Sequence, residues 1–124
     1  MINMVAIAGR LARPAETRIL PSGSRVVGID LTVPREQEPD ETAPLAWTDP
    51  PAWASELDAG AEVVAVGRVR RRFFTAGGHT QSRTEVVVEQ LVLATSRKRA
   101  GAALARVAAR LEAAAEAAAE GVKS

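Results

Sequence analysis

The 124-residue sequence predicts a small all-β domain of five strands closed into a barrel, followed by an Ala-rich helix. Two observations predict this fold class. Over residues 3–93, short segments that alternate apolar and polar side chains are separated by turns containing Gly and Pro. From residue 97 the composition changes to Ala with Arg and Glu, which are strong helix formers. Five strands in so short a chain remove their exposed edges most economically by closing on themselves.

The first half of the chain predicts two long strands. Asn3–Leu11 is the first, and Gly9 within it predicts a bulge or a sharp bend. Pro14 ends this strand, and Thr17–Leu20 is compatible with a return to strand. A Pro-Ser-Gly-Ser turn then leads into Arg25–Val33, which has apolar residues at every second position. The two strands are therefore expected to form a hairpin.

The second half predicts three more strands and a short helix. The strands are Ala43–Thr48, Glu62–Phe74 and Gln81–Leu93. The acidic segment Arg35–Thr42 is expected to be a surface loop. Asp49 is placed to cap a short helix over Ala52–Leu57, with Pro in its opening turn. A Gly-Gly turn joins the last two strands.

Residues 1–95 are expected to form the β domain and residues 96–124 a helical tail. On a helix one apolar stripe would contain Leu104, Val107, Leu111, Ala114 and Ala118. Basic residues come first in this segment and glutamates last, the reverse of what the helix macrodipole favours. Two tails running antiparallel would relieve this arrangement, and the alternative interpretation is a frayed, solvated appendage.

Charge and composition exclude several function classes. Residues 1–96 hold ten Arg and twelve Asp or Glu, whereas residues 97–124 hold six basic and three acidic residues. Binding of a polyanion by the β domain therefore has to come from a local patch. There is no cysteine, and His79 in the Gly-Gly turn is the only histidine. We expect no metal site, cofactor, small-molecule substrate or catalysis. No signal peptide or membrane span is predicted, so we expect a cytoplasmic protein.

The end of the fourth strand carries the main functional signal. Alternation places Arg68, Arg70, Arg72 and Phe74 on one face. Cations for phosphates beside a flat ring for a base are the combination that binds single-stranded nucleic acid. A bulge between Val66 and Arg70 would reverse the faces and turn Phe73 toward the ligand instead. The alternative interpretation is an edge strand protected by its charges.

The two tryptophans have competing interpretations. Trp47 ends the third strand, where it either stacks on a base or seals the barrel. Trp53 lies within the short helix and is expected to pack that helix onto the strands.

Several short motifs follow one another in a fixed order along residues 3–93. They are the strand containing Gly9, the segment Pro14–Arg18, the turn Ser22-Gly23, the segments Leu57–Gly60 and Val63–Arg68, and the run Thr84–Val87. In order and spacing they resemble the bacterial single-stranded DNA-binding protein family, whose domain is a five-stranded Greek-key OB (oligonucleotide/oligosaccharide-binding) barrel. The resemblance therefore implies an OB fold.

The resemblance also implies a function. It predicts binding of single-stranded DNA without strong sequence preference, in replication, repair or recombination, by a nucleoid-associated homo-oligomer, either dimer or tetramer. It assigns base stacking to Phe74 and Trp47 and phosphate binding to arginines. The predicted binding residues are Trp47, Phe74, Arg68, Arg70, Arg72, Arg10, Arg18 and Arg83.

The sequence departs from the family pattern in two places. Residues 35–42 are short, acidic and without aromatics, and Glu41 stands where a further stacking residue is expected. The chain ends in Lys123-Ser124 instead of an acidic tip with a terminal aromatic, so recruitment of partners by such a tip is not implied. These departures suggest a divergent or accessory paralogue. They leave open an OB-fold protein-interaction subunit with weak or no nucleic-acid binding, and the sequence does not separate DNA from RNA.

Overall fold

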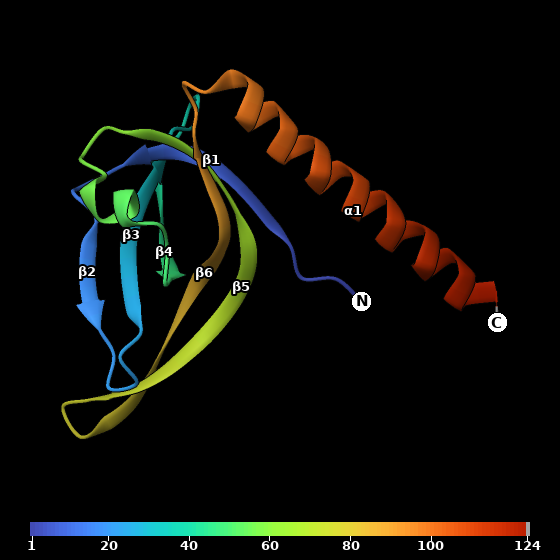
Figure 1. The fold of residues 1–124 in the computed structure, drawn as a ribbon. Helices are drawn as coiled ribbons and strands as arrows, with labels where there is room; N and C mark the ends of the chain where they lie inside the picture. The colour runs from blue at the N-terminus through green and yellow to red at the C-terminus, as the bar shows by residue number, and fades with distance from the viewer. Residues whose placement is uncertain (124) are drawn as a thin grey trace.

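The computed structural model describes residues 1–123, so Ser124 of the predicted tail lies outside the described residues. The elements in chain order are β1 (Val5–Leu11), β2 (Glu16–Ile19), β3 (Arg25–Val33), β4 (Glu41–Thr48), the 3₁₀ helix η1 (Ala52–Glu56), β5 (Glu62–Ala76), β6 (His79–Leu93) and α1 (Arg97–Lys123). Figure 1 shows the strands wrapping around one another while α1 projects away from them. The expectation of a mostly β protein with a C-terminal helix is confirmed.

The strands of the described chain form one six-stranded sheet in the order β1-β5-β6-β4-β3-β2. The sheet closes into a ring because β1 also pairs with β3, through Arg10 with Thr32 and Leu11 with Leu31. Within the ring, β4 and β6 run parallel and the other neighbours antiparallel. The sixth strand, β2, lies outside the ring against β3, where the sequence was compatible with a return to strand. It therefore raises the strand count above the predicted five.

The hydrophobic core lies inside this ring and is built by residues of the five ring strands together with Ala54 and Leu57. On β3, Val27, Ile29 and Leu31 are almost completely buried, as the alternating pattern predicts. Other core residues are Leu11, Leu45, Trp47, Ala54, Leu57, Val63, Ala65, Val86, Val88 and Leu91. The core is mostly aliphatic, which leaves both phenylalanines outside it.

Two glycines are required by close approach of strands. A Cβ atom on Gly9 would overlap the carbonyl oxygen of Thr32, and one on Gly67 would overlap that of Val87. The β1–β5 ladder runs in continuous register from Val5 to Arg10, so of the two alternatives predicted at Gly9, a bulge or a sharp bend, the bulge does not occur. Gly9 instead lets β1 lie against β3, where the ring closes.

The helix-capping role predicted for Asp49 is wrong. Pro51 occupies the N-cap position of η1, and within the described residues no side chain caps this helix. The Asp49 carboxylate accepts a hydrogen bond from the backbone N–H of Arg25 at 2.9 Å, and the Arg25 guanidinium donates to the carbonyl of Pro50. Asp49 therefore connects the end of β4 to the start of β3. Its carboxylate is hydrogen-bonded there and does not cap the helix.

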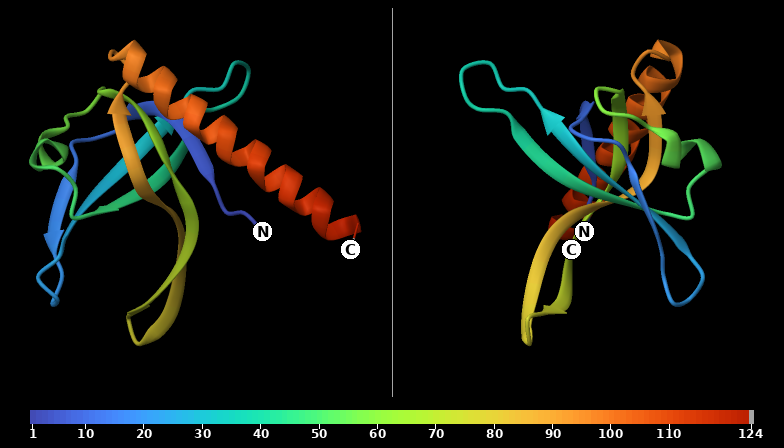
Figure 2. Two further views of the ribbon diagram at one scale, coloured as in Figure 1. Left: turned by 45° about the vertical axis from the view of Figure 1, so that its right-hand side comes forward. Right: turned by 90° about the vertical axis from the view of Figure 1, so that its left-hand side faces the viewer.

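Helix α1 contacts β5 and β6 through its first half. Ala103 and Val107 are 1% and 8% exposed, whereas Leu104 and Leu111 are 45% and 46% exposed. The predicted stripe is therefore divided between a buried face and an open one. Arg110 forms an ion pair with Glu89 of β6 at 3.4 Å. Figure 2 shows the second half of α1 standing away from the strands. In residues 1–123 no helix is long and apolar enough to cross a membrane.

Candidate nucleic-acid interface

The β5–β6 hairpin extends beyond the ring, and its faces are fixed by alternation in β5 (Figure 1). The β5–β6 register shifts between Val66, which pairs with Gln90, and Gly67, which pairs with Val88. The extra residue, Glu89, is therefore on β6, and the alternation of β5 continues unbroken. The bulge that would have reversed the faces of Phe73 and Phe74 does not occur in β5.

Of the face predicted from alternation, Arg70, Arg72 and Phe74 form a structural unit, whereas Arg68 is exposed. Arg70, Arg72 and Phe74 are half-buried side by side on one face of the hairpin. Val69 and Phe73 lie on the opposite face and are 42% and 67% exposed. Arginine side chains and an aromatic ring are thus gathered on one surface, which we call the arginine face (Arg70, Arg72 and Phe74).

The buried carboxylate of Glu85 holds the two arginines of this surface in place. Glu85 of β6 is opposite Arg70 in the ladder, and its side chain is 4% exposed. Its Oε1 atom lies 2.6 Å from Nη2 of Arg70 and 3.6 Å from Nε of Arg72. Because one buried negative charge serves two guanidinium groups, the cluster keeps an excess positive charge. A buried carboxylate is stable only when it is paired in this way.

The two arginines keep hydrogen-bonding capacity. The Nε atoms of Arg70 and Arg72 are buried and have no hydrogen-bond acceptor among the described residues. The guanidinium carbon of Arg72 lies 5.5 Å from the centroid of the Phe74 ring, which is a cation–π distance. Arg72 therefore contacts both Phe74 and Glu85, and these two contacts fix its guanidinium group beside the ring.

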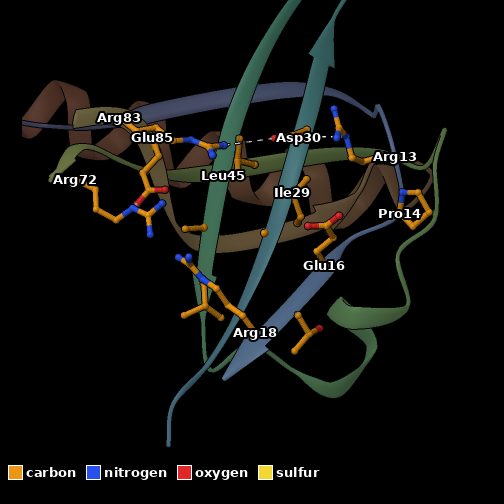
Figure 3. A pocket seen from close by; sticks show the side chains of 14 residues that line it. Arg13, Pro14, Glu16, Arg18, Ile29, Asp30, Leu45, Arg72, Arg83 and Glu85 are labelled. Carbon is orange, nitrogen blue, oxygen red and sulfur yellow. Dashed lines mark ion pairs between the residues drawn. The ribbon is translucent and has the colours of Figure 1, made fainter. Parts of the chain in front are cut away.

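A groove continues from the arginine face across β2, β3 and β4. Its charged lining residues are Arg13, Arg18, Arg72, Arg83, Glu16, Asp30 and Glu85. Figure 3 shows Asp30 between two guanidinium groups. Its carboxylate lies 3.2 Å from Nε of Arg13 and 3.7 Å from Nη2 of Arg83. The groove repeats the arrangement at Glu85, with one carboxylate holding two arginines in place.

The structure brings some of the sequence-predicted residues together and leaves others apart. Arg18, Arg72 and Arg83 line the groove, and Arg70 and Phe74 adjoin it. Arg68 is exposed on β5 but is not part of the groove lining. Arg10 lies on β1, where it pairs with Asp40 at 3.3 Å and faces a different hollow. Arg10 is therefore outside the candidate interface.

The structure places Trp47 in the core, which disfavours its predicted stacking role. The residue is 8% exposed and belongs to the core inside the ring. Its ring meets Trp53 edge-on, with centroids 5.6 Å apart and planes at 73°. Trp53 packs η1 onto the strands through this contact but stays 42% exposed. This packing of the indole favours the interpretation in which Trp47 seals the barrel.

Sequence reasoning missed Arg13, Asp30 and Glu85. Asp30 places a charge within a mostly apolar strand, and Glu85 directly precedes the apolar run Val86–Val88; both are available signals because a charge next to a core needs a partner. Their partners are 15 to 53 residues away in sequence, at Arg70 for Glu85 and at Arg83 for Asp30. Only the strand pairing reveals them.

The ring and the arginine face define a small β protein with cations and an aromatic ring on one surface. No family model matches the chain. The chain is similar to a single-stranded DNA-binding protein of Thermus aquaticus, with 34% identity over 92 residues, covering 68% of this chain and 35% of that protein. This chain therefore spans about a third of the length of that relative.

Proposed function

We propose that this protein binds single-stranded DNA without strong sequence preference and without catalysis. The binding surface is the arginine face together with the groove lined by Arg13, Arg18 and Arg83. We further propose that the ring is an OB fold and that the chain is a divergent or accessory member of the bacterial single-stranded DNA-binding protein family. Residues 1–95 form the binding domain and residues 96–124 the helical tail.

The fold assignment is supported by topology. An OB fold is a small, closed Greek-key arrangement that binds oligonucleotides on the face of its second and third strands and on the loop between its last two. In this protein the corresponding parts are β3, β4 and the β5–β6 hairpin. The arginine face lies on the hairpin, and the groove is lined by β3, β4 and the hairpin together with residues 13–18 beside them. The similarity to a single-stranded DNA-binding protein of Thermus aquaticus supports the ligand class.

The observation that carries the proposal is the Arg72–Phe74 contact on the face shared with Arg70. A single strand presents phosphates and unstacked bases together, so its binding surface needs cations beside an exposed aromatic ring. The Arg72 guanidinium lies 5.5 Å from the Phe74 ring centroid. A base stacks on the ring while the neighbouring phosphates accept hydrogen bonds from the arginines. Neither contact reads base identity, which explains the absence of strong sequence preference.

The carboxylates beneath the arginines serve binding by fixing their geometry. An unpaired arginine loses rotamer freedom when it grips a phosphate, at a cost of about 0.5–1.5 kcal/mol for each immobilised side chain. Glu85 holds Arg70 and Arg72 in place before DNA arrives, and Asp30 does the same for Arg13 and Arg83. The side chains of Arg70 and Arg72 stay 40% and 30% exposed, so phosphate oxygens reach the outer part of their guanidinium groups and not the buried Nε atoms.

The biological setting belongs to the same proposal. A sequence-tolerant single-strand binder acts where strands are separated, in DNA replication, repair or recombination at the nucleoid in the cytoplasm. We also propose that the protein is a homo-oligomer, because each copy offers only one phenylalanine in the described binding surface. Several copies acting together would compensate for the small number of stacking residues.

Fluorescence anisotropy of an end-labelled oligo-dT, titrated with the full chain at low salt, tests the proposal. The expected result is saturable binding in which log Kd rises linearly with the logarithm of the salt concentration. A hairpin duplex of equal length is the control and should bind more weakly. Absence of an anisotropy change at low salt would overturn the proposal and favour the protein-interaction subunit, an alternative supported by the acidic residues 35–42.

A further inference from the structure

Gly28 lies in the middle of β3, where the fold gives no reason for a glycine. Its φ lies outside the left-handed region, unlike that of the turn glycines. A Cβ atom on Gly28 would meet nothing closer than the carbonyl oxygen of Glu16 at 3.7 Å, which is an ordinary contact, whereas Gly9 and Gly67 are required by close strands. A glycine inside a strand weakens the strand and often marks a place where a ligand approaches the backbone closely.

Gly28 lies on the floor of the groove. Its neighbours in β3, Val27 and Ile29, point into the core, so alternation turns the Gly28 position to the outer surface. In the sheet Gly28 pairs with Glu16 of β2 and with Ala46 of β4, and all three residues line the groove. The floor is therefore flat and low at this point, because neither Gly28 nor Ala46 has a long side chain.

The charges around this floor favour a neutral group on it. The arginines of the groove stand on its two walls, the hairpin and residues 13–18 (Figure 3). Asp30 and Glu85 each contact two arginines, whereas Glu16 forms no ion pair within residues 1–123. A phosphate on the floor would meet the unpaired charge of Glu16. Phosphates therefore fit the walls of the groove, and a base fits its floor.

We propose that Gly28 and Glu16 form a base-binding subsite in the groove, separate from the stacking position at Phe74. One base of the single strand lies with its ring against the backbone of Gly28, and its Watson–Crick edge donates a hydrogen bond to the Glu16 carboxylate. Every DNA base carries an N–H group on that edge, so the subsite accepts any base. This inference rests on the proposed binding of single-stranded DNA and names the part of the strand that occupies the groove.

Substitutions at Gly28 test the subsite, with labelled oligo-dT and fluorescence anisotropy on the full chain. Gly28→Ala and Gly28→Val should keep or exceed the wild-type urea midpoint, since the added Cβ has room and valine favours strands. Their Kd should nevertheless rise by about threefold and about tenfold, because the side chain occupies the space of the base. Gly101→Ala in α1 is the matched control; its Cβ also meets nothing within 4 Å, and Kd should not change.

An abasic oligomer of the same length identifies the group that lies on the floor. Both Gly28 variants should bind this oligomer as tightly as the wild type does, because its phosphates remain on the walls of the groove. If the variants lose as much affinity for the abasic oligomer as for oligo-dT, the sugar–phosphate backbone lies at Gly28. That result would overturn the assignment of a base.

Glu16→Ala tests the hydrogen bond to the base edge. Its Kd for oligo-dT should rise by about threefold through the lost hydrogen bond. Its Kd for the abasic oligomer should fall, because a negative charge has been removed from the groove. A lower Kd for both oligomers would show that Glu16 only repels phosphate, and it would overturn the role of Glu16 in the subsite.

The wild type separates this inference from the proposed function. If the wild type does not bind oligo-dT at low salt, both are overturned. If the wild type binds and the two Gly28 variants bind with the same Kd, only the base-binding subsite is overturned. Should Gly28→Val lower the urea midpoint, Gly28→Ala carries the test, since its Cβ has ordinary contacts only.

Discussion

The sharpest test of the proposed interface separates two adjacent phenylalanines. Phe74 lies on the arginine face, half-buried, with the Arg72 guanidinium 5.5 Å from its ring centroid. Phe73 is next to it in sequence but points to the opposite face, where it is 67% exposed. Phe74→Ala and Phe73→Ala therefore remove the same side chain from two sides of one strand.

The magnitude follows from the chemistry of the contact. Removing an aromatic side chain on which one base stacks costs about 1–3 kcal/mol of binding free energy. Since each 1.4 kcal/mol is a factor of ten, Phe74→Ala should raise Kd by about 5- to 150-fold. The free energy of unfolding should fall by much less than the about 3–5 kcal/mol typical of a buried phenylalanine, because Phe74 lies outside the core.

The assay is anisotropy with labelled oligo-dT at one fixed salt concentration, accompanied by urea unfolding of each variant. Phe73→Ala should leave Kd near the wild-type value and Phe74→Ala should not. The reasoning is refuted if Phe73→Ala weakens binding as much as, or more than, Phe74→Ala. It also fails if Phe74→Ala unfolds the protein, because the ring would then be a structural element and not a stacking surface.

Further predictions address the cations and the ring closure. The double variant Arg70→Ala with Arg72→Ala should be made in a Glu85→Gln background, so that no buried carboxylate is left unpaired. It should reduce the salt slope of log Kd by about 1.4, because each phosphate contact to a single strand contributes about 0.7. Glu85→Gln alone is the control, and an equal slope in both would count against the phosphate role. Arg10→Ala should change the salt slope of log Kd by less than about half of one phosphate contact, since Arg10 pairs with Asp40 outside the groove. A decrease equal to one full phosphate contact would support the sequence-based assignment of Arg10 to phosphate binding. Gly67→Ala should lower the free energy of unfolding by about 1–3 kcal/mol in urea titration, because its Cβ would overlap a carbonyl oxygen of β6. An unchanged urea midpoint would show that the two strands separate easily at this point.

Local patterns in the sequence predicted most of the secondary structure. The five long strands and the helices occur close to their predicted positions, because side-chain alternation and turn residues act over a few neighbours. The predicted fourth and fifth strands, β5 and β6, each extend two residues further toward the Gly-Gly turn than predicted. The turn itself lies where it was predicted. The error at Asp49 and the absence of the bulge at Gly9 have a different origin. Both residues are committed to partners on strands that are distant in sequence.

The candidate site shows the same division more sharply. Alternation within β5 placed Arg70, Arg72 and Phe74 on one face, and the structure retains that grouping because the register shift falls on the neighbouring strand. Nothing local could show that Trp47 is enclosed by the ring or that Arg10 faces away from the groove. Burial depends on which strands close around a residue, and a single strand carries no information about its neighbours.

Alternation along one strand was enough to predict that Arg70, Arg72 and Phe74 share a face, because a strand turns successive side chains to opposite sides. The opposed charge halves of α1 are likewise a matter of residue order. The contacts of Glu85 with two arginines and of Asp30 with two others became visible in the folded chain alone. These contacts require the pairing of β5 with β6 and of β3 with its neighbours. Strand pairing is settled by closure of the whole ring, in which the burial of one shared core selects a single register.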